Sequence, residues 1–145
     1  MSNLVSAEKI TDYIPQRAPF VMVGDLLKRE NNQAISQFYI GENNILVKDG
    51  EFTVSGLLEN IAQTAAANAG YDCYLKNIPV PLGFIGAISK VSVQALPKAE
   101  SRVETKIEVL QEIFGITLIK GEVTQNNQPI ISCQMKIMIQ KESEQ

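Results

Sequence analysis

The sequence predicts a domain of the α+β class, in which a curved antiparallel β-sheet wraps around one long central α-helix. Residues 55–76 have the length and the alanine-rich, nearly all-apolar composition of a helix that the rest of the protein encloses. The residues after them have the composition of consecutive strands, without the alternation of strand and helix that a parallel sheet requires. A helix that is apolar nearly all round does not fit a flat sheet with a wet outer face, so we expect the sheet to curve.

Composition narrows the classes of function. The chain has 145 residues, the size of one domain, and we assign residues 1–145 to that domain. Its net charge is -3 and its positive charges are scattered, which argues against a nucleic-acid partner. No apolar run reaches the roughly 20 residues of a membrane span, and the amino terminus lacks a signal pattern. We therefore expect a cytoplasmic protein in which Cys73 and Cys133 are reduced.

The residues before the long helix predict a short helix and a hairpin. Ser6 can cap an amphipathic helix that runs to Tyr13 and ends before Pro15. Apolar, β-branched runs separated by a polar turn predict the hairpin. Its strands and the polar loop that follows are expected at residues 20–29, 34–40 and 41–51.

The long helix is expected at residues 55–76, with Ser55 or Thr53 as its amino-terminal cap. Its many alanines let other parts of the backbone approach closely. The alternation of apolar and polar residues is clear in two of the four segments that follow. These four strands are expected at residues 83–93, 101–112, 113–124 and 129–140. The last five residues, 141–145, are expected to be frayed.

Three segments of the chain are similar to one family of enzymes. Residues 14–25, IPQRAPFVMVGD, resemble an opening Pro-His-Arg-x-Pro-Phe pattern, with Gln16 in place of the histidine. Residues 56–64, GLLENIAQT, resemble a helix in which a glutamate is followed four residues later by a glutamine. Residues 83–97 resemble the strand that follows this helix and the turn after it. The segments have the order and spacing of the family and span most of the chain.

The pattern resembles that of the hot-dog-fold 3-hydroxyacyl-ACP dehydratases, where ACP is acyl carrier protein. The helix is most similar to a subgroup associated with aryl-polyene and related pigment gene clusters. The resemblance implies the hot-dog fold, in which a curved sheet wraps around the central helix. It also implies acyl thioesters on ACP or CoA as ligands, in fatty-acid or polyketide-type metabolism. The implied partner is a second subunit, either a copy of this chain or a histidine-bearing homologue.

Glu59 is the strongest candidate for a catalytic residue. A carboxylate inside an apolar helix is costly to bury in its ionised form, and such a group can exchange a proton near neutral pH. The resemblance implies that Glu59 lies beside the thioester and acts on its β-hydroxyl, and that Gln63 orients the carboxylate from one helical turn away. The alternatives are that Glu59 bonds a backbone group or faces a subunit interface, and that Gln63 is an ordinary buried amide.

The predicted substrate-binding residues are Val54, Ser55, Gly56 and Phe84. The first three lie at the start of the long helix, where free backbone N–H groups can hold a thioester carbonyl. Phe84 belongs to the third similar segment. Every helix has free donors at its start, so this feature has low specificity.

The chain contains no histidine. The resembled dehydratases have a catalytic histidine shortly before the glutamate, and the corresponding region around Ile45 has no suitable base. Dehydration requires removal of an α-proton and protonation of the leaving hydroxyl, and one carboxyl can do only half of that at a time. Asp25 is expected to make a structural hydrogen bond, and Lys48 and Asp49 to be solvated loop charges. Without histidine or thiol clusters we expect no cysteine nucleophile, no metal and no cofactor.

Three functions are open at this point. The first is a dehydratase-like protein that binds acyl thioesters and is non-catalytic alone, or forms one half of a heterodimeric dehydratase. The second is an active enzyme, either a 3-hydroxyacyl thioester dehydratase or an acyl thioesterase in which Glu59 activates water. The third is a purely structural or interaction dimer. The first is favoured because Glu59, Gln63 and the helix start are kept while the histidine is absent.

Overall fold

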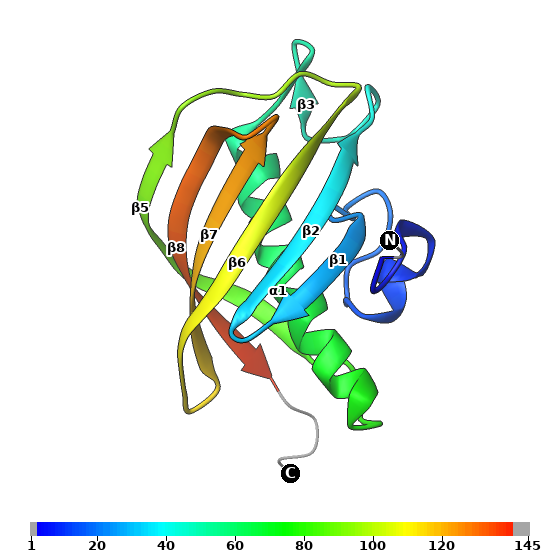
Figure 1. The fold of residues 1–145 in the computed structure, drawn as a ribbon, viewed down its shortest axis with the longest axis vertical. Helices are drawn as coiled ribbons and strands as arrows, with labels where there is room; N and C mark the ends of the chain where they lie inside the picture. Colours follow the sequence, from blue (N-terminus) through cyan, green and yellow to red (C-terminus); the bar gives the residue numbers. More distant parts are fainter. Residues whose placement is uncertain (1–2, 141–145) are drawn as a thin grey trace.

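The computed structural model describes residues 3–140, and the expected fraying of residues 141–145 lies outside them. A six-stranded antiparallel sheet with the strand order β1-β2-β6-β7-β8-β5 curves around the long helix α1 (Figure 1). This arrangement confirms the predicted α+β class and the predicted curved sheet. In chain order the elements are the 3₁₀ helix η1 (Ala7–Asp12), β1 (Asp25–Glu30), β2 (Gln33–Ile40), β3 (Val47–Lys48), β4 (Glu51–Phe52), α1 (Val54–Leu75), β5 (Leu82–Val93), β6 (Ser101–Ile113), β7 (Ile116–Gln125) and β8 (Gln128–Gln140).

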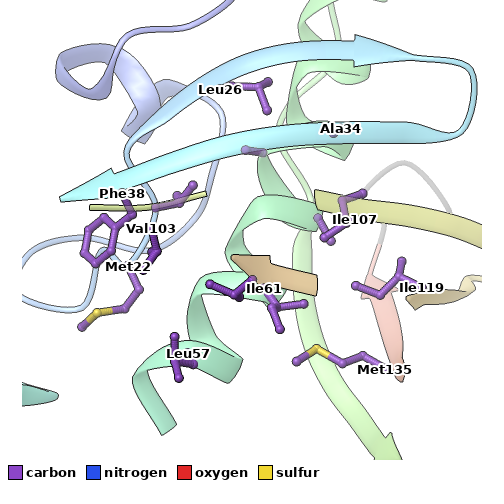
Figure 2. Close-up of a cluster of buried hydrophobic side chains, with 14 of the residues drawn as sticks. Met22, Leu26, Ala34, Phe38, Leu57, Ile61, Val103, Ile107, Ile119 and Met135 are labelled. Carbon is purple, nitrogen blue, oxygen red and sulfur yellow. The ribbon is translucent and has the colours of Figure 1, made fainter. Parts of the chain in front are cut away.

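The helix α1 is enclosed as its composition predicts. It lies one residue upstream of the predicted range at each end, and Thr53 rather than Ser55 caps it by accepting the N–H of Gly56 at 3.2 Å. Figure 2 shows Leu57 and Ile61 of α1 among the strand residues that complete the core. These strand residues come from every long strand of the sheet except the edge strand β5 and include Leu26, Ala34, Phe38, Val103, Ile107, Ile119 and Met135.

Two glycines allow close approaches to α1. Ile61 packs against Gly121 of β7, where an added Cβ would overlap the isoleucine side chain. Gly70 on the helix lies against the carbonyl oxygen of Tyr13, and a Cβ at this position would overlap that oxygen. The second contact fixes the segment after η1 on the carboxyl-terminal half of the helix.

The strand predicted to begin at Phe20 begins only at Asp25, so the first half of that prediction is wrong. Side chains of α1 take the place of a neighbouring strand. Met22 N–H donates to Gln63 Oε1 at 2.6 Å, Gln63 Nε2 donates to the Phe20 carbonyl at 2.9 Å, and Asn60 Nδ2 donates to the Met22 carbonyl at 2.7 Å. The apolar pattern of this segment therefore reflects burial against the helix rather than pairing in a sheet.

The amino-terminal helix also differs from its prediction. It is a short 3₁₀ helix, and Ser6 makes no side-chain cap. Asp25 Oδ1 instead accepts the N–H of Ala7 at 2.7 Å, which confirms the structural hydrogen bond expected of this carboxylate. An anionic acceptor at the start of the helix satisfies one of the backbone donors that the first turn leaves free.

Two further regions differ from their predictions: one predicted loop contains a pair of short strands, and one strand begins later than expected. The predicted polar loop 41–51 contains the short antiparallel pair β3–β4, whose turn places Asp49 and Gly50 in the left-handed region with φ of 53° and 79°. The strand expected at residues 113–124 starts at Ile116, because Phe114 and Gly115 form the turn before it.

The edge strand β5 is exposed along its whole length. It carries six large apolar side chains that solvent reaches, namely Leu82, Phe84, Ile85, Ile88, Val91 and Val93. Relative to its neighbour β8, the strand holds one extra residue between Ile85 and Ala87 and another between Ser89 and Ser92. Each extra residue is a β-bulge, which bends a strand and interrupts its ladder.

Among the described residues, no helix is both long enough and apolar enough to cross a bilayer.

We predict that Gly70→Ala destabilises the protein, because the added methyl group overlaps the Tyr13 carbonyl. The free energy of unfolding is expected to fall by about 2 kcal/mol, which is typical of overpacking. This loss exceeds the roughly 1 kcal/mol that alanine contributes in helix propensity. Urea denaturation followed by circular dichroism measures the change. Gly41→Ala is the control, since an added Cβ there meets nothing within 4 Å. Equal stability of the two variants would contradict the close contact.

Candidate functional site

Glu59 lies at the wall of a cavity of about 330 Å³. The cavity is bounded by α1, by the segment before β1, and by β5 and β8. Its lining includes Pro15, Gln16, Glu59, Ala62, Ala66 and Phe84. A carboxylate, an amide and apolar side chains therefore face the same cavity.

Glu59 is half-buried, although its apolar surroundings in the sequence suggest full burial. The next residues on this face of α1, Ala62 and Ala66, line the cavity while packing against the edge of the core. An alanine side chain is too short to fill the space between the helix and the sheet edge. The carboxylate of Glu59 is therefore open to the cavity and to a ligand within it.

Gln63 fixes the carboxylate of Glu59. Its side chain is 1% exposed, and its Nε2 lies 2.9 Å from Glu59 Oε2. The same amide bonds the backbone of Phe20 and Met22, so both of its N–H groups and its oxygen have partners. Gln63 is thus a buried amide with structural bonds and also the neighbour of the carboxylate. A catalytic role for the pair stays a prediction.

The other predicted binding residues lie in different places. Phe84 lines the cavity from the edge strand and is 57% exposed. Val54, Ser55 and Gly56 do not line it, because Glu59 projects from the helix a full turn beyond them. The N–H of Gly56 is also occupied by the Thr53 hydroxyl.

A second, mostly apolar cavity of about 70 Å³ lies next to the first one along α1. The two cavities share Ala66, Gly83 and Ile137 in their walls. Beyond this junction the walls are mostly apolar, and the far end is lined by Asn68 and Asp72. The two cavities therefore adjoin one another between the helix and the sheet.

Sequence reasoning missed most of the cavity wall. Pro15, Ala62 and Ala66 carry no pattern that separates a cavity from ordinary packing. Gln16 was noted only because it replaces a histidine of the resembled family, and that replacement was the available signal.

No second acid or base stands beside Glu59 among the lining residues. Asp25 caps η1. Lys48 and Asp49 are exposed as expected, although Lys48 belongs to β3 and only Asp49 lies in the turn that follows it. Both cysteines are unpaired, and burial raises the pKa of the Cys133 thiol to about 11. In the part of the chain that the structure describes, no group of three or more His, Cys, Asp or Glu side chains is placed to hold a metal ion.

A curved antiparallel sheet around one long helix, with a carboxylate facing a cavity at the sheet edge, defines a hot-dog protein. Comparison with known families identifies the particular family of hot-dog proteins. The profile of the ApeP-like family, described as ApeP dehydratase, matches residues 8–145, and the chain belongs to this family. No curated protein sequence matches the chain.

Solved structures confirm the hot-dog fold. A chain of the dehydratase heterocomplex ApeI:P from Xenorhabdus doucetiae has a TM-score of 0.84 at 16% identity, with 93% of each chain covered. The virulence protein Cj0977 from Campylobacter jejuni has a TM-score of 0.68 at 15% identity, covering 98% of this chain and 97% of its own. A hypothetical thioesterase with coenzyme A from Streptococcus pneumoniae has a TM-score of 0.60 at 11% identity, covering 79% and 84%.

We predict that Gln63 and Glu59 differ sharply in their effect on stability. Gln63→Leu leaves the buried N–H of Met22 and the part-buried carbonyl of Phe20 without partners, and the free energy of unfolding is expected to fall by about 2–3 kcal/mol. Glu59→Gln keeps an oxygen for Gln63 to bond at a half-buried position, so its effect is expected to stay within about 0.5 kcal/mol. Urea denaturation of both variants measures the difference. A large loss in Glu59→Gln would show that the carboxylate is itself structural.

We predict that the two cysteines differ in reactivity. The thiolate is the reactive form, and the raised pKa of buried Cys133 keeps it protonated at about pH 8. A thiol-alkylating reagent is therefore expected to modify half-buried Cys73 in the native protein and Cys133 only after unfolding. Mass spectrometry of native and urea-treated samples identifies the sites, and Cys133→Ser is the control. Equal labelling of both thiols in the native protein would contradict the burial of Cys133.

Proposed function

We propose that this chain binds acyl thioesters and supplies the carboxylate of a heterodimeric 3-hydroxyacyl thioester dehydratase. Alone, it binds the thioester but dehydrates it very poorly. The observation that carries the proposal is the carboxylate of Glu59, held at a cavity by Gln63 in a chain without histidine. Half of the acid–base pair that dehydration needs is present, and the other half is missing.

The missing half is assigned to a histidine of the partner subunit. Its imidazole takes a proton from the α-carbon of the 3-hydroxyacyl thioester, while protonated Glu59 donates to the β-hydroxyl. The carbon–oxygen bond breaks, the α,β double bond forms, and the products are water and an enoyl thioester. Glu59 is left as a carboxylate and the histidine as an imidazolium, so a proton returning from one to the other restores the site.

The apolar cavity next to the Glu59 cavity is the proposed place of the acyl chain of such a substrate. It shares Ala66 and Ile137 with the Glu59 cavity and lies between α1 and the sheet. Each methylene group moved from water into an apolar cavity contributes about 0.8 kcal/mol of binding free energy. The carrier, ACP or CoA, stays outside with the thioester at the cavity. The proposed setting is fatty-acid or polyketide-type metabolism in the cytoplasm.

The edge strand β5 is the proposed seam between the subunits. An exposed edge with six large apolar side chains is a template for pairing with another strand. A second subunit bound there would cover those side chains and close the Glu59 cavity from the side of Phe84. The partner is a histidine-bearing homologue in the active complex, and a second copy of this chain in a resting form. The similarity to a chain of the dehydratase heterocomplex ApeI:P supports a partner of the first kind.

We predict that activity appears only in the mixed complex and depends on Glu59. The chain is co-expressed with a histidine-bearing homologue from the same operon, and water loss from a 3-hydroxyacyl thioester is followed. Relative to that complex, the chain alone and the complex carrying Glu59→Gln are each expected to be about 10²–10⁴-fold slower, the usual cost of losing an acid or base. Glu104→Gln, an exposed change on β6, is the control.

Several results would contradict this proposal. If the mixed complex forms and Glu59→Gln does not slow it, the carboxylate has no part in the reaction. If the chain alone is as fast as the complex, it contains a base that its composition does not reveal. Release of the free thiol instead of water would identify an acyl thioesterase. Failure to bind any acyl thioester would leave a structural or interaction dimer.

A further inference from the structure

Gln16 carries a buried polar atom that the protein does not satisfy. Within the described part of the chain, its Oε1 is the one buried side-chain nitrogen or oxygen without a hydrogen-bond partner. Buried polar atoms in native proteins are nearly always bonded, because an unpaired one has lost its bonds to water without replacement. An exception therefore needs an explanation, and a ligand is one.

The position of Gln16 points to such a ligand. Gln16 lines the same cavity as Glu59, from the segment before β1. The backbone on both sides of it is fixed, since Arg17 Nη1 donates to the carbonyl oxygens of Ile14 and Gln16, each at 2.8 Å. The amide is thus held at the cavity wall by a braced segment and does not belong to a loose loop.

Gln63 shows what an amide with all its partners inside the protein looks like at this site. All the hydrogen-bonding groups of Gln63 are occupied by Glu59, Phe20 and Met22. The Gln16 oxygen has no such partner, and the last torsion of a glutamine side chain is broad, so its amide can turn toward a ligand.

We infer that Gln16 is a ligand-binding residue of the Glu59 cavity and that its amide oxygen accepts a hydrogen bond from the β-hydroxyl of a 3-hydroxyacyl thioester. The inference rests on the proposed function and specifies how the same site recognises its substrate. A hydroxyl has one hydrogen to donate and two lone pairs that accept. The β-hydroxyl of the substrate donates to Gln16 and accepts from protonated Glu59. The two side chains together therefore orient the hydroxyl so that one of its lone pairs faces the proton of Glu59.

A substrate without the hydroxyl leaves Gln16 unpaired. The cavity is therefore expected to prefer a 3-hydroxyacyl thioester over the saturated acyl thioester of the same length. One hydrogen bond of this kind corresponds to a preference of about ten-fold in dissociation constant.

The test is isothermal titration of the chain with 3-hydroxydecanoyl-CoA and with decanoyl-CoA, two probes that differ only in the hydroxyl. The wild type is expected to bind the hydroxylated probe about ten-fold more tightly. Gln16→Met keeps the length of the side chain and removes its polar atoms, so it is expected to abolish the preference while decanoyl-CoA binds as before. Gln128→Met, an exposed change at the start of β8, is the matched control and keeps the preference.

The stability of the unliganded variant gives a second readout. Because Oε1 has no partner in the protein, Gln16→Met is expected to be at least as stable as the wild type in urea denaturation. A loss of stability would assign Gln16 to the fold and overturn the inference. The inference also fails if Gln16→Met retains the preference for the hydroxylated probe or binds both probes more weakly by the same factor. It fails as well if the wild type binds both probes equally. Binding of neither probe to the wild type would overturn the proposed function as well.

Discussion

The backbone from Phe20 to Met22 pairs with no strand, and two amides of α1 supply its hydrogen bonds. Asn60 and Gln63 bind the segment from Phe20 to Met22, and Asn60 is in turn bonded by Thr105 of β6. A buried donor or acceptor left unpaired costs about 1–3 kcal/mol. The rest of the site depends on this constraint. It fixes the segment that carries Gln16, and it leaves one N–H of Gln63 aimed at Glu59.

Structure and chemistry are therefore coupled through one side chain. Gln63 cannot turn away from Glu59 without releasing the Phe20 carbonyl, because one Nε2 serves both. This coupling holds the carboxylate in one orientation. The bonds that position Glu59 belong to the fold of this chain, and the region around Ile45 makes none of them.

The sequence predicts those parts of the fold in which apolar residues recur at the spacing of a helix or a strand. The helix α1 and the strands β5 to β8 are found within a few residues of their predicted limits, because long patterns leave few alternatives. The segment from Phe20 to Gly24 was misassigned because an extended chain buried on a helix has the same apolar pattern as a strand. The position of Glu59 on the helix was predicted, but the cavity beside it was not. Small side chains such as Ala62 and Ala66 fit equally well against packed backbone and at the wall of a void.

The bulges of β5 have a consequence for which chains can associate. A strand that continues the sheet beyond β5 must follow a backbone that gains an extra residue after Ile85 and another after Ser89, with Lys90 in a left-handed conformation at φ 54°. A regular, straight strand falls out of step with such an edge after a few residues. The bulged main chain of β5 thus favours pairing with strands that have matching irregularities. It disfavours the unspecific strand pairing that leads to aggregation.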